Sequence, residues 1–452
     1  DAWNTLISHH PMLRVKYTSN GKQKIISNPE KREIVIHDLK DMTEDIISLE
    51  LEKIRKRMAH RLLDIENGKV TGMEISILPD YNTRIHFDID LLVADVQSFQ
   101  IILRDLVAIY NRNQMPKAPK NWSFGRYLKK FEKDQLVIKN EAKKYWDGML
   151  DTLQGPPSLP LAKKPEEIED VKFKRHEYFL NKSYWEGIKR KSAGYGITPA
   201  MTFLTAYAKI IERWSSNEKF LMNIPLFNRD CLDKELENVV ADFTNLLLMQ
   251  MDFTNEESFV SSAKKIQEQF HNNMKYSAYS GVEIQRDLAK LHKEQKNFAP
   301  VVFSCNLGEP LINNEFRDVL GEITYMISQT PQVWIDLQIF NYEDGVLLIW
   351  DSVEEMFPKD MLDDMFNRFT LLLEQLGADD DLWNSSPRLI PEKQSKIRDD
   401  INKKNTLELD NNLHTSFFKY ASISPDKIGV IDTNTGKQYT YGELLDDTLK
   451  VA

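Results

Sequence analysis

Strand-like and helix-like hydrophobic patterns alternate along this chain, and the alternation restricts it to mixed α/β folds. Residues 84–90 alternate apolar with polar side chains, which is the period of a half-buried strand, and residues 102–110 carry apolar side chains at helical spacing. The second half repeats the succession, with a helix predicted over 198–211 and strands over 220–227 and 301–307. We therefore expect a fold of the α/β (α+β) class.

The chain is too long for one ordinary hydrophobic core, because domains usually contain about 100 to 200 residues and this chain has 452. Four prolines between residues 154 and 170 predict a boundary between two lobes, which we place over residues 1–165 and 166–385. Polar residues and further prolines predict a linker over 386–410, followed by a remainder over 411–452. Two lobes and a short additional segment are expected.

Two local signals are specific enough to place element boundaries. Thr198 followed by Pro199 predicts the start of a helix, because Thr caps free backbone N–H groups and Pro fits the first turn. Residues 341–345 separate two strand-like runs, 334–340 and 346–350, and end in an Asp-Gly pair. This arrangement predicts a β-hairpin.

Composition argues against several classes of protein. The formal net charge of −10 disfavours general nucleic-acid binding, which needs an excess of clustered Lys and Arg. No apolar run approaches the ~20 residues that span a bilayer, and the first residues lack a signal-peptide pattern. Cys231 and Cys305 have no metal-ligand spacing, so neither a disulfide framework nor a zinc site is predicted. We expect a cytoplasmic protein without nucleic-acid, membrane or metal partners.

Asp90, Asp95 and Ser98 form a DxxxxDxxS pattern where a predicted strand gives way to the next helix. Two carboxylates in such a loop could hold a divalent cation, but no third acidic ligand stands at a matching offset. Their expected role is to cap the helix, with Ser98 as a possible N-cap, and to pair with an arginine. Neither His86 nor His176 has a Ser or Cys at a recognisable spacing, so no hydrolase triad is predicted.

Later segments extend this pattern in a fixed order. They read ADFTNLLL (241–248), PVVFSCNL (300–307), SQTPQVWID (328–336), WD (350–351) and FP (357–358). Together with DxxxxDxxS they resemble the heterocyclization branch of the condensation-domain family of nonribosomal peptide synthetases, where DxxxxDxxS replaces the HHxxxDG of ordinary condensation domains. HPMLR at 10–14 resembles an early segment of the family. The resemblance runs from Asp1 to about Trp383.

The two ends of the chain carry further expectations from the resemblance. The family's first motif, of the type FPLTxxQxAYxxGR, is not found, which implies that the first helix and strand of the N-terminal lobe are missing. A chain extended at its N-terminus should then melt at a higher temperature. Beyond the linker, residues 413–417, 424–426, 430–432 and 439–444 resemble the opening of an adenylation domain, so 411–452 is expected to be its N-terminal fragment.

The resemblance implies two lobes similar to chloramphenicol acetyltransferase, arranged as a V-shaped pseudo-dimer with a central tunnel. Upstream and downstream peptidyl carrier proteins would deliver thioesters on phosphopantetheine arms, and an adenylation domain would lie adjacent in cis. No cofactor would be bound directly. The implied reaction joins an upstream acyl group to the amine of carrier-bound Cys, Ser or Thr, and cyclodehydration then gives a thiazoline or oxazoline.

Dehydration needs a group that gives a proton to a leaving hydroxide and takes one from nitrogen, and a carboxyl of raised pKa suits this work. Asp336 is the leading candidate, because alternation places it opposite the apolar face of its strand; an exposed or ion-paired Asp is the alternative. Ser304 stands where the family has Thr, and Asn223 matches a position that holds the intermediate. The alternative for Ser304 is a hydroxyl bonded to a neighbouring backbone group, and the alternative for Asn223 is an Asn at a strand end or a turn. The resemblance assigns tunnel-shaping roles to Asp90, Asp95, Ser98, Gln332, Asn306 and Trp334.

Three functions therefore compete. The first is the heterocyclizing enzyme, the second a non-catalytic module that docks carrier proteins, and the third a plain amide-forming condensation domain. The intact region around Asp336 argues against the second function, and the missing HHxxxDG argues against the third.

Overall fold

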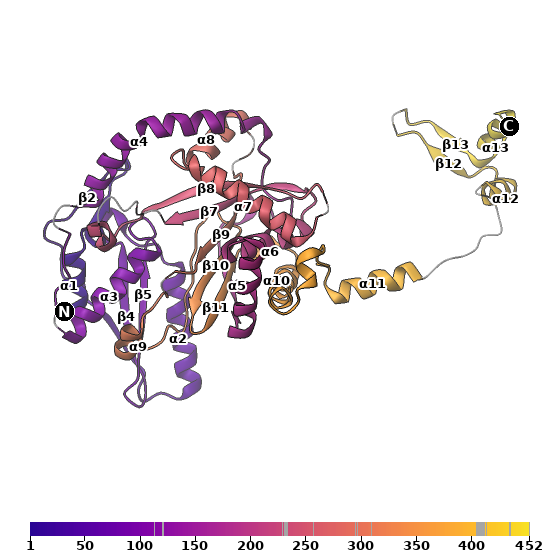
Figure 1. Ribbon diagram of the computed structural model, residues 1–452. Coiled ribbons are helices and arrows are strands. Elements are labelled where there is room, and N and C mark those ends of the chain that lie inside the picture. Colours follow the sequence, from indigo (N-terminus) through magenta and orange to yellow (C-terminus); the bar gives the residue numbers. More distant parts are fainter. Residues whose placement is uncertain are drawn as a thin grey trace. The chain divides into compact units, whose positions relative to one another are not determined.

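The computed structural model in Figure 1 describes residues 1–452 except 113, 120–121, 228, 230–233, 256, 294, 296, 309, 404–411, 413, 434 and 452, and except the side chains of 132 and 134. Cys231, part of the predicted linker and Leu413 lie outside the described residues. The chain forms two compact units, Asp1–Leu389 and Ile390–Ala452. No helix among the described residues has the length and apolar character needed to cross a membrane.

A six-stranded sheet organises the second half of the first unit. Its strands, in the order β6-β11-β10-β9-β7-β8 across the sheet, are β6 (Lys174–Leu180), β11 (Gly345–Ser352), β10 (Ile335–Tyr342), β9 (Val301–Asn306), β7 (Lys219–Phe227) and β8 (Thr244–Asp252). Strand β9 runs parallel to both β7 and β10, and the other neighbours are antiparallel. The predicted strands and the predicted hairpin are confirmed, with Glu343 and Asp344 between the register partners Tyr342 and Gly345.

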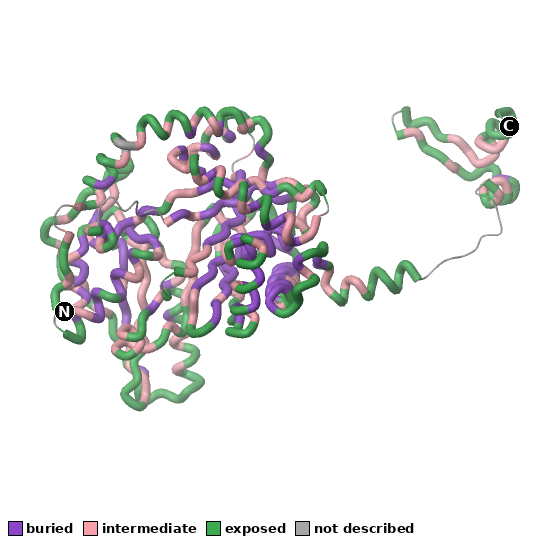
Figure 2. The backbone as a smooth tube through the Cα atoms, viewed as in Figure 1, coloured by how far each residue is buried: buried purple, intermediate pink, exposed green. Residues whose placement is uncertain are grey.

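Helices cover one face of this sheet and form the largest core with it (Figures 1 and 2). They are α5 (Lys182–Tyr195), α6 (Pro199–Trp214), α7 (Phe259–Lys275) and α10 (Met361–Ala378), with α8 (Gly281–Leu291) against β8. Helix α6 begins as predicted, because the Thr198 side chain accepts a hydrogen bond from the Met201 N–H and Pro199 occupies the first turn. Its residues 201–211 are buried throughout, which explains the apolar pattern.

Trp383 closes the end of this core. Its ring is fully buried, packs against Phe259 and Tyr195 at centroid distances of 5.4 Å, and donates from Nε1 to the Leu376 carbonyl at 2.9 Å. We predict that Trp383→Ala lowers the free energy of unfolding by about 3 to 5 kcal/mol, because it leaves a large cavity and an unpaired carbonyl. Urea unfolding would measure the loss. Leu371→Ala is the control, since that side chain is exposed on α10 and should change stability little.

A three-stranded sheet organises the first half of this unit. Its order is β3 (Val35–Asp38), β4 (Thr71–Ile77) and β5 (Thr83–Ile89), where β5 is the strand predicted over 84–90. Helices α1 (Ala2–His9) and α3 (Val96–Arg112) supply apolar residues to its core, and α2 (Glu44–His60) contacts β5. Two short strands, β1 (Val15–Tyr17) and β2 (Gln23–Ile25), form a separate ladder.

The two halves of the unit exchange segments. Residues 236–243, which lie between β7 and β8, pack in the core of the first half, and α9 (Asn314–Leu320) lies against α3. In the opposite direction, the long helix α4 (Phe124–Asp147) places Tyr127 in the first-half core and Trp146 in a third cluster beside β7 and β8. The hydrophobic cores therefore do not divide the chain at one point in the sequence.

The second unit is small. It contains α11 (Glu392–Lys403), α12 (Thr415–Ile423), β12 (Ile428–Ile431), β13 (Gln438–Thr440) and α13 (Tyr441–Val451). Helix α11 lies within the stretch 386–410 that we predicted to be a linker and occupies 12 of its residues, and its apolar Ile397 and Ile401 are exposed. The α11 sequence is nearly all charged or polar, which is also typical of a linker. A helix is compatible with it, because Glu392 and Lys396, one turn apart, form an ion pair.

Candidate functional site

A row of polar side chains crosses the six-stranded sheet on the face opposite the helices. The register aligns Arg175 on β6 with Asp351 on β11, Asp351 with Asp336 on β10, and Gln338 on β10 with Ser304 on β9. Asn223 on β7 aligns with Val302, the neighbour of Asp336 on β9. We call these six residues, Arg175, Asp351, Asp336, Gln338, Ser304 and Asn223, the polar row. Three separate sequence predictions, Asp336, Ser304 and Asn223, are thus brought onto adjacent strands.

Alternation along β10 explains how a carboxylate comes to lie here. Ile335, Leu337 and Ile339 are fully buried in the helix-covered core, as predicted, so Asp336 and Gln338 must face the other side. The same alternation on β11 buries Trp350 among the helices and turns Asp351 toward the polar row. The hairpin register then sets the two carboxylates, Asp336 and Asp351, directly opposite one another.

Asp351 is the carboxylate whose charge is compensated. It is fully buried and accepts two hydrogen bonds from Arg175, from Nε at 2.8 Å and from Nη2 at 2.6 Å. The backbone N–H of Ser328 donates to its Oδ2 at 3.2 Å, and the Gln338 amide adds a contact at 3.3 Å. This bidentate geometry is the strongest form of Arg–carboxylate pairing, and it commits Arg175 to Asp351.

Asp336 has a different environment, although it is only one strand away. Burial, and secondly the negative charge of Asp351, raise the pKa of Asp336 to about 7, while the hydrogen bond from Gln338 and the charge of Arg175 act in the opposite direction. Its Oδ1 is buried and has no hydrogen-bond partner among the described residues. A carboxyl with this pKa can both give and take a proton near neutral pH.

The segment before β10 joins this site to the first half of the unit. Ser328 donates its backbone N–H to Asp351, and the next residue, Gln329, donates from Nε2 to the Ala59 carbonyl on α2 at 2.5 Å. Arg55 of α2 also stacks on the Tyr325 ring at 4.6 Å. The polar row is therefore held from both halves of the unit.

Ser304 and Asn223 complete the row on β9 and β7. Ser304 is buried, and its register partner is Gln338, whose amide bonds Asp336. Asn223 donates from Nδ2 to the Ala299 carbonyl at 2.8 Å and accepts from Gln285 at 3.3 Å. Its amide is thus used at both ends within the protein, and only its remaining hydrogen-bonding capacity is available to another molecule.

The other residues expected along the tunnel lie near the ends of these strands. Trp334 precedes β10, is half-buried and donates its backbone N–H to the Pro300 carbonyl at 2.8 Å. Gln332 is exposed, and its carbonyl accepts from Asn297 at 2.5 Å. Asn306 ends β9 and is half-buried.

We predict that Ser304→Ala slows ring formation about tenfold, the value of one hydrogen bond of ordinary strength, because water can replace a hydroxyl more readily than a carboxyl. Single-turnover rates of amide and ring formation would measure it. Ser352→Ala is the matched control, since Ser352 is also buried but pairs in register with Ile335 on the helix-covered face. Equal rates for Ser304→Ala and the parent chain would contradict a role for this hydroxyl.

Two residues of the DxxxxDxxS pattern, Asp95 and Ser98, form a separate, buried centre with Arg229. Asp95 Oδ1 accepts from the Ser98 N–H at 2.7 Å and from Arg229 Nη2 at 2.8 Å, and Arg229 also donates to the Ser98 hydroxyl at 2.8 Å. Ser98 in turn donates to the Ala241 carbonyl at 2.6 Å. The cap of α3 is therefore Asp95 and not Ser98, because the helix begins at Val96, three residues earlier than an N-cap at Ser98 would place it.

Within the described part of the chain, Asp90 makes no hydrogen bond to this centre; its Oδ1 accepts from the Leu92 N–H at 2.9 Å, which shapes the turn after β5. Arg229 is the arginine that we expected to pair with these residues, and the sequence alone did not identify it. It lies in the same segment as Asn223, NIPLFNR, so the motif itself contained the signal.

One group in the described part of the chain has the spacing of metal ligands, and it lies outside the polar row. His9, His10 and Asp105 place one ligand atom each within 4.8 Å of one another. Asp105 already accepts from His10 Nε2 at 3.0 Å and from Arg104 Nε at 2.9 Å. These two bonds occupy the Asp105 carboxylate and make it part of a structural hydrogen-bond network between α1 and α3.

His86 has a serine neighbour, Ser76, that we did not predict from the sequence. The Ser76 hydroxyl and His86 Nε2 lie 2.9 Å apart across β4 and β5. Their separation of ten residues is set by the β4–β5 register and not by a short motif. Burial lowers the pKa of His86 to about 4, and Ser76 is fully buried, so the pair is placed as a structural hydrogen bond and not as an accessible nucleophile.

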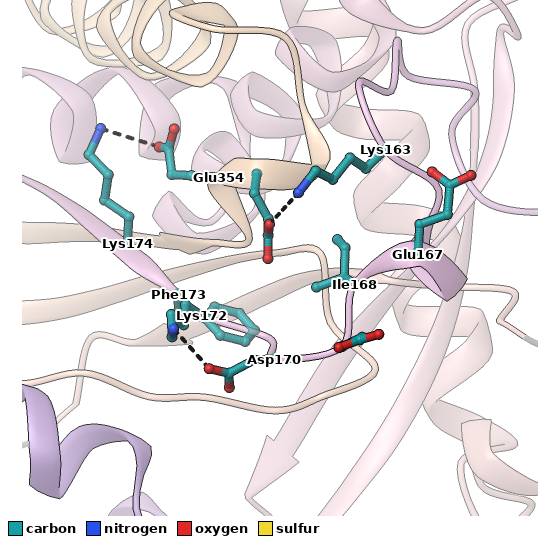
Figure 3. Close-up of a pocket in the computed structure, with 10 residues that line it drawn as sticks. Lys163, Glu167, Ile168, Asp170, Lys172, Phe173, Lys174 and Glu354 are labelled. Carbon is teal, nitrogen blue, oxygen red and sulfur yellow. Dashed lines mark hydrogen bonds and ion pairs between the residues drawn. The ribbon is translucent and has the colours of Figure 1, made fainter.

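A charged hollow on the surface, shown in Figure 3, contains none of the polar row. Its three lysines each pair with a carboxylate of the same hollow: Lys163 with Glu355 at 2.8 Å, Lys172 with Asp170 at 2.8 Å, and Lys174 with Glu354 at 3.4 Å. These pairings leave the hollow little free positive charge with which to recognise a ligand.

Comparison with known proteins gives a family-level match. The family described as "Condensation domain" matches residues 1–397. Phenyloxazoline synthase MbtB of Mycobacterium sp. (strain MCS) is 33% identical over 448 residues, which cover 99% of this chain and 38% of that protein. Pyochelin synthetase PchE of Pseudomonas aeruginosa (strain UCBPP-PA14) is 32% identical over 445 residues, covering 98% and 30%. The chain thus spans about a third of the length of these relatives.

A solved structure agrees with this match. The cyclization-docking bidomain of the nonribosomal peptide synthetase EpoB from Sorangium cellulosum has a TM-score of 0.76 and 28% identity, covering 85% of this chain and 77% of the other. The two-lobed condensation-domain architecture predicted from the motifs is therefore confirmed for the first unit.

Proposed function

Because the chain belongs to the condensation-domain family of nonribosomal peptide synthetases, we propose that it is a heterocyclization domain. It joins an upstream acyl thioester to the amine of Cys, Ser or Thr on a downstream carrier and then closes the ring by loss of water. The relatives named phenyloxazoline synthase and pyochelin synthetase and the cyclization bidomain support this choice over plain condensation. So does the absence of HHxxxDG from the sequence.

The observation that carries the proposal is the protonation of Asp336 near neutral pH. Its pKa of about 7 and its unpartnered Oδ1 give the polar row one carboxyl that holds a transferable proton near neutrality. Ser304 lies on the next strand, as the register partner of Gln338. Plain amide formation does not require such an acid, because aligning two tethered substrates already supplies much of the rate. Dehydration does require one, since hydroxide is a poor leaving group until it is protonated.

Ring closure and the loss of water follow amide formation. The side-chain thiol or hydroxyl attacks the new amide carbon, and its proton passes to the former carbonyl oxygen, which becomes a hydroxyl on a tetrahedral carbon. Asp336 gives its proton to this hydroxyl, the carbon–oxygen bond breaks and water leaves. The nitrogen then forms the carbon–nitrogen double bond and releases its proton to the Asp336 carboxylate. The acid is regenerated, and the net change is the loss of one water.

Partners and neighbours belong to the same proposal. Carrier proteins deliver both substrates on phosphopantetheine arms, and the domain itself binds no cofactor directly. Residues 411–452, with their α12, β12, β13 and α13, form the start of an adenylation domain. Whether Cys, Ser or Thr is cyclised would then be read by the remainder of that domain.

We predict that dehydration slows as the pH rises through about 7, whereas amide formation does not follow the same curve. The direction follows from the chemistry, because only protonated Asp336 can donate, and its protonated fraction falls above its pKa of about 7. Quenched time courses at several pH values would separate the two steps. A dehydration rate that stays constant through this range would contradict Asp336 as the acid.

Incubation of the complete module with both loaded carriers, followed by intact-mass measurement of the carrier-bound product, tests the proposal. Loss of one water beyond condensation supports a heterocyclization domain. Condensation without that loss would identify a plain condensation domain. The absence of any product, with both carriers verified as loaded, would point to a docking module.

A further inference from the structure

We propose that Gln338 is a positioning residue that confines the proton of Asp336 to Oδ1. The inference rests on the proposed function and adds an oriented donor to it. Gln338 is buried and lies on β10 two residues after Asp336. It stands outside the motif segment 328–336, and we predicted no role for it from the sequence alone.

The orientation of the Gln338 amide is fixed by two acceptors. Its Nε2 lies 2.7 Å from Asp336 Oδ2 and 3.3 Å from Asp351 Oδ2. A carboxylate can only accept hydrogen bonds, so the NH₂ end of the amide, which carries two donors, must face both carboxylates. Arg175 holds Asp351 by a bidentate pair and thereby keeps the second acceptor in place.

This orientation decides where the proton of Asp336 resides. Because Oδ2 accepts from Gln338, a proton on Oδ2 would turn two donors toward each other. The proton therefore resides on Oδ1, the oxygen that is buried and has no partner among the described residues. Oδ1 can then donate to a substrate without first breaking a hydrogen bond within the protein.

The charged and titratable groups that face Asp336 come from several elements. Asp351 faces it from β11, and the charge of Arg175 on β6 opposes that of Asp351. Tyr207 of α6 does not share this face, because its ring is fully buried in the helix-covered core; burial, together with the charge of Asp336, raises its pKa well above the usual value. Tyr325 lies beside Arg175 and Asp351, and burial raises its pKa too. The inferred role belongs to Gln338 because it alone among these groups bonds both carboxylates.

Gln338→Met tests the inference, since it keeps the length of the side chain and removes both donors. We expect dehydration to slow about tenfold to a hundredfold, the range for a hydrogen bond to a charged group. The pH midpoint of dehydration should move upward, because the lost bond had favoured the ionised form. Amide formation should keep its rate. Gln338→Glu, which cannot donate when ionised, should shift the midpoint in the same direction.

Asp344→Asn is the matched control, because it removes a carboxylate from the turn of the same hairpin, where Asp344 is exposed and pairs only loosely with Lys182 at 3.8 Å. It should leave both steps unchanged. If Gln338→Met folds with an unchanged melting temperature and keeps the parent rate and midpoint, the inference is overturned while ring formation by the parent chain still supports the proposed function. If Gln338→Met fails to fold, Gln338→Glu decides by the same two readouts. A parent module that makes no ring refutes the proposed function instead.

Discussion

Asp336→Asn is expected to slow ring formation by about 10²- to 10⁴-fold, the usual contribution of general acid–base catalysis, while amide formation persists. The substitution keeps the size of the side chain but removes the proton that Asp336 carries below its pKa of about 7. Amide formation depends more on aligning two tethered substrates, so linear peptide thioester should accumulate on the downstream carrier. Intact-mass time courses would show this as product that has condensed but has not lost water.

The stability of the same variant provides an internal control. The folded protein holds the Asp336 proton more tightly than an unfolded chain, where Asp has its ordinary pKa of about 3.9. Stability is therefore lost as the pH rises from that ordinary value through about 7. Asp336→Asn should be at least as stable as the parent chain at neutral pH. Equal loss of both chemical steps in a protein of unchanged melting temperature would make Asp336 a substrate-positioning residue instead.

Asp95→Ala is expected to lower the free energy of unfolding by about 3 to 5 kcal/mol, as measured when one partner of a buried ion pair is removed. Asp95 and Arg229 are both nearly inaccessible to solvent and lie 2.8 Å apart. The substitution also removes the cap of α3 and leaves Arg229 beside the ring of Phe243, at 4.5 Å from its centroid. Urea unfolding of the two proteins would measure the difference.

Asp90→Ala is the matched control for the same motif. The Asp90 side chain lies at a half-buried turn, where its Oδ1 accepts one hydrogen bond from the Leu92 N–H, so its loss should cost about 1 kcal/mol or less. A large stability loss for Asp90→Ala, or a small one for Asp95→Ala, would contradict the division of DxxxxDxxS into a turn residue and a buried ion-pair centre.

Local patterns were sufficient to predict the strands that carry the site. Alternation placed Asp336 opposite Ile335 and Leu337, the Asp-Gly turn predicted the hairpin, and Thr198 marked the start of α6. These predictions hold because a period of two or 3.6 residues is a property of neighbouring residues alone.

Interactions across strands were the part that the sequence did not predict. Asp351 raises the pKa of Asp336 only because the hairpin register sets the two side by side, and Arg175 is 176 residues away from Asp351 in the chain. The pair of Arg229 with Asp95 depends likewise on residues 236–243 entering the core of the first half. Such contacts follow from tertiary packing, which hydrophobic periodicity does not encode.

The protonation of Asp336 in the folded protein is the claim on which the account depends, and isotope-edited infrared spectroscopy measures it without substrates. We predict a protonated-carboxyl C=O band in the parent chain that disappears with a midpoint near pH 7 and is missing from Asp336→Asn. Two results would contradict the protonation of Asp336. One is a parent chain that shows no such band at any pH above the ordinary pKa range of Asp, and the other is an Asp336→Asn variant that keeps the band.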